Sequence, residues 1–91
     1  MGFLKTRWEA GHEGHQILVT RNELTKGFWV LVDGVEIGRA RWSLAGTGEI
    51  RGTFRSGDRE VPITAVLKLS MKRAVCEIIV DGAPITVWNL R

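Results

Sequence analysis

Apolar and polar residues alternate with a period of two along most of the chain, which is the pattern of strands with one buried face. The longest run, residues 61–71, places Val61, Ile63, Ala65, Leu67, Leu69 and Met71 on one face and mostly polar residues on the other. Residues 17–19 and 28–32 carry apolar groups on both faces, so we expect these two strands in the interior of a sheet. No segment shows the 3.6-residue apolar period of a helix.

Two similar segments, VLVDGVEI at residues 30–37 and IIVDGAPI at residues 78–85, indicate tight turns. Asp33-Gly34 and Asp81-Gly82 are pairs that tolerate the positive φ angles of a two-residue hairpin loop. Each pair stands between alternating apolar residues, which is a strong hairpin signature. A catalytic pair of carboxylates is the alternative, but it requires the two turns to meet at one end of the fold. We therefore interpret both aspartates as turn residues.

The turn signals divide the chain into about eight short strands without intervening helices, which predicts a single domain at residues 1–91 with an antiparallel β-sandwich or flattened barrel. After Ile37 the apolar residues move from odd-numbered to even-numbered positions, and a β-bulge at Gly38-Arg39 would keep them on one face of the strand. The expected strands are residues 4–9, 15–20, 28–33, 35–42, 49–55, 60–70, 74–81 and 83–90.

Composition is that of an ordinary folded domain. The chain has 91 residues, 44% of them hydrophobic and 25% charged, and a net charge of +3. No run approaches the ~20 apolar residues of a membrane span, and the N-terminus lacks the apolar core of a signal peptide, so we expect a cytoplasmic protein. Cys76, the only cysteine, stands in the apolar run AVCEIIV, and we expect an inert buried thiol.

The residues that could carry chemistry do not form a recognised motif. GHEGH offers His12, Glu13 and His15, but it lacks the spacing and the further ligands of a closed metal site, so we expect a solvent-facing His12 and a strand that starts at His15. A Ser-His-Asp triad can be assembled on paper from Ser43, Ser56 or Ser70, yet no nucleophile-elbow motif is present. We predict no enzyme, with no catalytic residue, cofactor or metal.

Arginines and tryptophans form the candidate interaction surface. We expect antiparallel pairing of the strands at residues 35–42 and 49–55 to gather the arginines into an exposed stripe, although interleaved glutamates and aspartates favour a neutralised surface. Trp8 and Trp42 are expected in the core. The predicted surface residues are Arg39, Arg41, Arg51, Arg55, Trp29 and Trp88.

The order of these features resembles one domain of the Fas apoptotic inhibitory molecule family. The resemblance is carried by Trp8, Gly14-His15, the apolar residues 17–19, the loop RNELTKG, FWVLVDGVEI, and a closing IIVDG. It implies a small non-catalytic β-sandwich that acts through protein contacts, with an apoptosis-regulating role in animal members. The middle of the chain, residues 39–62, departs from the family pattern.

Two functions from different classes remain. The first is a non-catalytic binding or adaptor protein whose partner is another protein. The second is a small nucleic-acid-binding β-barrel that uses the arginine stripe, with an exposed tryptophan as a stacking partner.

Overall fold

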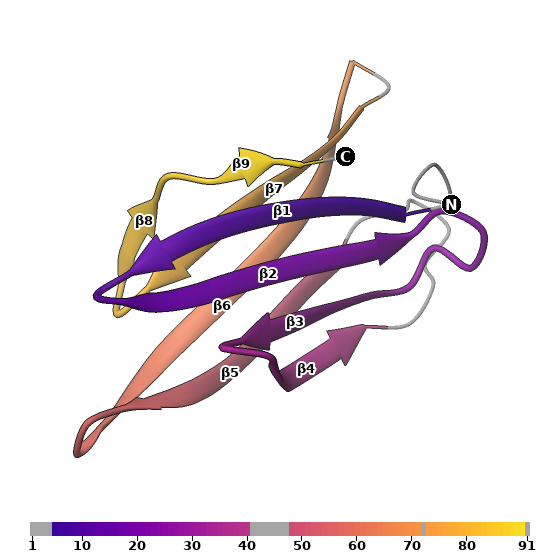
Figure 1. The fold of residues 1–91 in the computed structure, drawn as a ribbon. Helices are drawn as coiled ribbons and strands as arrows, with labels where there is room; N and C mark the ends of the chain where they lie inside the picture. Colours follow the sequence, from indigo (N-terminus) through magenta and orange to yellow (C-terminus); the bar gives the residue numbers. More distant parts are fainter. Residues whose placement is uncertain (1–4, 41–47, 72, 91) are drawn as a thin grey trace.

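The computed structural model describes residues 5–40, 48–71 and 73–90, and these residues form a sandwich of two antiparallel β-sheets (Figure 1). The described part contains no helix, so the all-β prediction is confirmed. The nine strands are β1 (Lys5–His12), β2 (His15–Asn22), β3 (Phe28–Val32), β4 (Val35–Ala40), β5 (Gly48–Ser56), β6 (Arg59–Ser70), β7 (Arg73–Val80), β8 (Ala83–Ile85) and β9 (Trp88–Asn89).

The chain builds the two sheets one after the other. Hairpins link β1 to β4 in the first sheet, whose order is β4-β3-β2-β1-β9, and link β5 to β8 in the second, whose order is β5-β6-β7-β8. The strands with apolar groups on both faces, β2 and β3, have a neighbour on each side, as expected. Neighbouring strands are therefore close in sequence, except where β9 returns to pair with β1.

The final strand differs from the prediction. Residues 83–90 were expected as one strand, but β8 lies in the second sheet and β9 in the first. Between them Val87 packs against the core, which draws the chain across from one sheet to the other. The prediction was wrong here because alternation specifies which residues are buried and not which sheet buries them.

The predicted bulge lies in β4, but one residue before the expected place. Val30 faces Gly38 and Leu31 faces Glu36, so Ile37 is the extra residue. Gly38 has a different role, because a Cβ atom built there would lie 2.6 Å from the Ile50 Cγ2 atom of β5. The missing side chain at Gly38 lets the two sheets approach at this side of the sandwich.

The inward faces of both sheets form one core of buried apolar residues. Trp8, expected as a core residue, is 3% exposed, whereas Trp42 lies outside the described residues. Cys76 is buried in this core, as predicted. The largest fully buried side chains are Ile17, Leu67, Ile78, Val19, Val30, Val61 and Val80.

Candidate functional site

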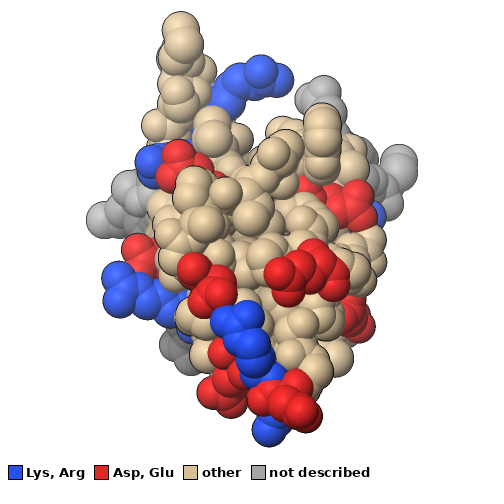
Figure 2. Space-filling model, turned by 90° about the vertical axis from the view of Figure 1, so that its left-hand side faces the viewer, with Lys and Arg blue, Asp and Glu red and all other residues tan. Residues whose placement is uncertain are grey.

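Four two-residue turns lie at one end of the sandwich, on the left in Figure 1. Asp33-Gly34 and Asp81-Gly82 have positive φ at both residues, which confirms them as tight hairpin turns. Glu13-Gly14 has the same geometry. The two Asp-Gly turns belong to different sheets and nevertheless share this end. Figure 2 shows it face on, with acidic and basic side chains intermixed.

His15 joins three of these hairpins at what we call the hairpin end. Its Nδ1 atom lies 2.6 Å from Asp33 Oδ2, and its Nε2 atom lies 3.0 Å from Ser56 Oγ. The Gln16 backbone N–H donates to Asp33 Oδ1 over 2.8 Å, and the Phe54 ring packs against the imidazole edge with centroids 5.1 Å apart. Ser56 belongs to the second sheet, so the imidazole connects the two sheets.

Charge at the hairpin end is balanced locally. The hydrogen bond from His15, helped by the Gln16 N–H, lowers the pKa of the Asp33 carboxyl below its usual value. Arg59 bonds to Asp81 over 2.8 Å, and this contact raises the pKa of the guanidinium. The Asp33 and Asp81 carboxylates each bond to a different partner and do not act as a pair.

The hydrogen-bond order Ser56–His15–Asp33 is that of a hydrolytic triad, with the serine on Nε2 and the aspartate on Nδ1. The same hydrogen bonds also have a purely structural role, because they hold three turns to one another.

The predicted solvent-facing position of His12 is not observed, since the side chain is only 21% exposed. Among the described residues no group of three potential ligands is placed to hold a metal ion.

The predicted arginine stripe does not form as expected. Within residues 5–40, 48–71 and 73–90, β4 pairs with β3 alone and β5 pairs with β6 alone, so the predicted pairing of these two strands is wrong. The reason is that the chain leaves the first sheet after β4 and starts the second with β5. Arg39 therefore lies on one sheet, Arg51 and Arg55 lie on the other, and Arg41 lies outside the described residues.

Two of these arginines have acidic partners. Arg39 makes two hydrogen bonds to Glu36, at 2.7 and 2.9 Å, and this contact lowers the pKa of the glutamate. Arg51 bonds to Glu49. These pairs support the interpretation of a neutralised surface.

The two candidate tryptophans lie far apart in the first sheet. Trp29 is half-buried on β3, in register with Arg39. Trp88 is 63% exposed on β9, in register with Glu9 of β1. The described candidate residues are thus divided among four strands, β3, β4 and β9 of the first sheet and β5 of the second.

A site that the sequence interpretation missed lies at the edge of the second sheet. β8 pairs only with Ile78, Ile79 and Val80, so residues 73–77 of β7 have a paired strand on the β6 side alone within the described structure. We call this open side the β7 edge. Pro84 in β8 was the available signal, since proline cannot donate to a ladder and marks an edge strand.

The backbone direction at the β7 edge follows from the pairing with β6. The Asp81 N–H donates to the Pro62 carbonyl over 2.9 Å, one residue beyond the Val80–Ile63 pair, so odd-numbered residues direct their N–H and C=O groups toward β6. Even-numbered residues of β7 therefore point their N–H and C=O groups away from β6. In the open segment these residues are Ala74 and Cys76.

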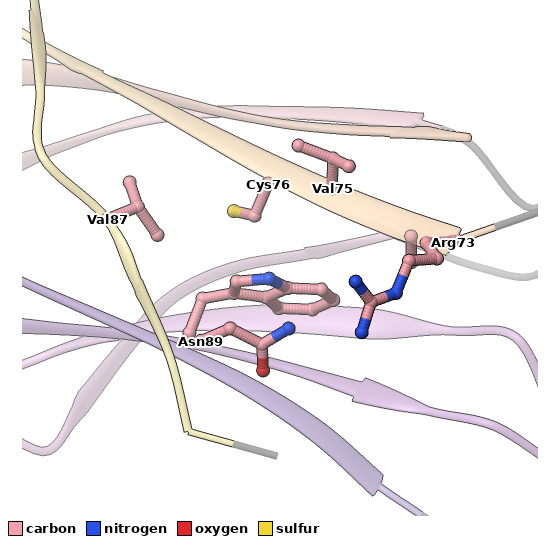
Figure 3. A pocket seen from close by; sticks show the side chains of 7 residues that line it. Arg73, Val75, Cys76, Val87 and Asn89 are labelled. Atoms are coloured by element: carbon pink, nitrogen blue, oxygen red, sulfur yellow. The ribbon is translucent and has the colours of Figure 1, made fainter. Parts of the chain in front are cut away.

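A pocket of about 430 Å³ lies behind the β7 edge, between the two sheets. Figure 3 shows the Cys76 thiol and the Arg73 side chain on its β7 side, Val87 and Asn89 on its other side, and Val75 pointing away from it. Burial raises the pKa of the Cys76 thiol to about 12, so the sulfur is a neutral, apolar part of the wall. Trp8 also lines the pocket.

Comparisons of the chain with protein-family models, with curated proteins and with solved structures find no match. The resemblance to the Fas apoptotic inhibitory molecule family therefore stays a prediction. In the described residues no helix meets the length and hydropathy of a membrane span.

Proposed function

We propose that this protein is a non-catalytic binding module that acts through protein contacts at the β7 edge. The observation that carries the proposal is a strand segment paired on one side only within the described structure, with a pocket of mixed polar and apolar lining behind it. An extended segment of a partner can add to such an edge as a further strand, with its backbone supplying affinity and its side chains supplying selectivity.

The other sheet edges are less open to such pairing. The long edge strand β5 lies against β4, since a Cβ atom built at Gly52 would lie 3.2 Å from the Ile37 carbonyl oxygen. β4 carries the bulge at Ile37 and a charged pair, β8 has three residues that include Pro84, and β9 has two residues. Bulges, prolines and short lengths are the usual means of blocking an edge. By contrast, the outer face of β7 exposes Val75, which is 39% accessible.

The resemblance to the Fas apoptotic inhibitory molecule family supports the same class of function, because that family acts through protein contacts. The nucleic-acid alternative has weaker support, since Arg39 and Arg51 are each paired with a glutamate and lie on different sheets. An uninterrupted positive surface would be expected of a protein that binds a phosphate backbone.

Site-specific photocrosslinking tests the proposal. A photoreactive amino acid is placed at Val75, and in a control at Val35, an exposed valine at the start of β4 that is 65% accessible. We expect discrete crosslinked protein products from the Val75 position in host cells and none from Val35. Equal product patterns at the two positions would show that the β7 edge has no special role.

A second candidate function, hydrolysis of an activated ester, is favoured by one observation, the Ser56–His15–Asp33 order. In that reaction Ser56 Oγ attacks the carbonyl carbon while its proton passes to His15 Nε2 and then to the leaving alcohol. Water then cleaves the acyl-serine and regenerates the hydroxyl.

Turnover of p-nitrophenyl acetate separates this candidate from a purely structural array. If Ser56 is catalytic, Ser56→Ala should lose turnover. Ser70→Ala, which changes an exposed serine at the end of β6, should keep it. Equal rates for the two variants and the native protein would exclude the hydrolytic role.

A further inference from the structure

We infer that the occupant of the β7 edge is a second copy of the same chain, joined by antiparallel pairing of β7 with β7. The inference rests on the proposed function, because it names the partner of the same site. It is carried by three properties of residues 73–77: the length of the open segment, the direction of its backbone groups, and the order of its side chains.

The open segment has a defined centre. It begins at Arg73, the first residue of β7, and ends at Glu77, before the first residue that β8 covers. Its middle residue is Val75. A two-fold axis through Val75 therefore brings the whole open segment of one copy against the whole open segment of the other, which is the self-complementary arrangement of a symmetric dimer.

This alignment also satisfies the backbone. With Val75 opposite Val75 of the second copy, Ala74 stands opposite Cys76 of the second copy, and both residues direct their N–H and C=O groups to the edge. Each such pair exchanges two hydrogen bonds, so the two symmetric pairs supply about four. A shift of two residues in either direction keeps only one of these pairs, because the other would fall on the β6–β7 turn or on the part covered by β8.

The side chains of the segment are complementary to themselves. In this register Arg73 stands opposite Glu77 of the second copy, and the symmetric pair repeats the contact. These positions, like that of Val75, are non-hydrogen-bonded pairs, in which the side chains of opposite residues lie closest. The exposed Val75 side chains thus meet at the axis, flanked by two pairs of opposite charge.

Neither charged side chain is tightly held in the single chain. Glu77 is 53% exposed in its ion pair with Lys68, at 3.0 Å, and exposed pairs of this kind contribute little. Arg73 is exposed and its side chain turns toward the pocket (Figure 3), so it must rotate to meet the glutamate of the second copy.

The dimer should be weak. Five residues on each side bury far less than the roughly 1,600 Å² of a standard stable interface. The dissociation constant is therefore expected to be micromolar or larger, so the dimer is visible only as a concentration-dependent equilibrium.

Sedimentation equilibrium of the full chain with charge-exchange variants tests the inference. The native protein should shift from monomer toward dimer as its concentration rises from about 10 µM to about 1 mM, the range that separates weak association from none. Glu77→Arg and Arg73→Glu should each weaken the dimer by about tenfold or more, since each creates two like-charge contacts. The double exchange Arg73→Glu/Glu77→Arg restores opposite charges and should return association to near the native level.

Glu49→Arg is the control for Glu77→Arg, because it makes the same change of net charge on the outer face of the same sheet, on β5. It should leave association unchanged. A native protein that stays monomeric at every concentration, or a double exchange no better than the single variants, would overturn the inference.

The photocrosslinker at Val75 shows whether only the homodimer is absent or whether the β7 edge binds no protein at all. Crosslinked homodimer supports both proposals. Crosslinks to foreign proteins alone overturn the second copy as occupant and leave the binding function standing, and no crosslink above the Val35 control overturns both.

Discussion

Gly38→Ala tests how the two sheets meet at the β4–β5 side of the sandwich. The added Cβ atom would lie 2.6 Å from Ile50 Cγ2, whereas carbon atoms in favourable contact are about 3.5–4.0 Å apart. Ile50 is 6% exposed and cannot move freely into solvent. Overpacking of this kind costs about 1–3 kcal/mol, partly offset by about 0.5–1 kcal/mol from the lower entropy of an unfolded chain with alanine.

We therefore expect Gly38→Ala to lower the free energy of unfolding by about 1–2 kcal/mol, or to lower Tm by roughly 4–16 °C for a domain of this size. Urea denaturation followed by tryptophan fluorescence measures the difference. Gly11→Ala is the control, because the nearest atom to a Cβ there, the His15 carbonyl oxygen, is 4.0 Å away. That variant should be neutral or slightly stabilised.

A double-mutant cycle makes the result specific. Ile50→Ala removes the Cγ2 atom, so Gly38→Ala should cost little in that background, and the coupling between the two sites should be about 1–2 kcal/mol. Equal stability of Gly38→Ala and Gly11→Ala, or zero coupling with Ile50→Ala, would refute the close approach of β4 and β5.

Three further measurements test other parts of the structure. Arg21 is only 7% exposed and lies 3.6 Å from Glu23, so Glu23→Gln should cost about 3 kcal/mol in urea unfolding, the low end for a broken buried pair because Glu23 is 28% exposed. The pKa of Asp33 is lowered in the folded state, so its stabilising contribution is present above pH 3.8 and is lost as the pH falls through the lower folded value. Asp33→Asn should therefore be less stable than the native protein near pH 6, and the difference should shrink as the pH falls below 3.8. The Cys76 thiol, with its pKa raised to about 12, should react with a thiol reagent at pH 8 far more slowly in the folded protein than in urea.

Each of these has a result that contradicts it. Unchanged stability of Glu23→Gln would mean that Arg21 does not depend on this carboxylate. Because asparagine tolerates the positive φ of residue 33, a constant difference across pH for Asp33→Asn would show that the contact with His15 has no electrostatic role. Rapid labelling of folded Cys76 would show that the pocket wall opens readily.

The strands and turns were predictable because their signals are local. Asp33-Gly34 and Asp81-Gly82 specify tight turns through their own backbone preferences, whatever surrounds them. The burial of Trp8 and the inward face of residues 61–67 followed from alternation in the same way. Such features need only the neighbouring residues in the chain.

The arrangement of strands in space was less predictable. Alternation states which face of a strand is buried, but it does not say that β4 and β5 belong to different sheets or that residues 83–90 divide between them. The contact between His15 and Ser56 joins residues 41 positions apart, and no local pattern encodes it. The β7 edge depends on how far β8 extends, for which Pro84 was the only local indication.

Whether the β7 edge is open in the single chain and covered by a second copy can be measured by site-resolved amide hydrogen exchange. We expect the amides of Ala74 and Cys76, which point away from β6, to exchange rapidly in dilute protein and to become protected at high concentration. The amides of Val75 and Glu77, which point toward β6, should be protected throughout. Equal protection of all four amides in dilute protein would show that the edge is already covered in the single chain, and that it is not open to a partner strand.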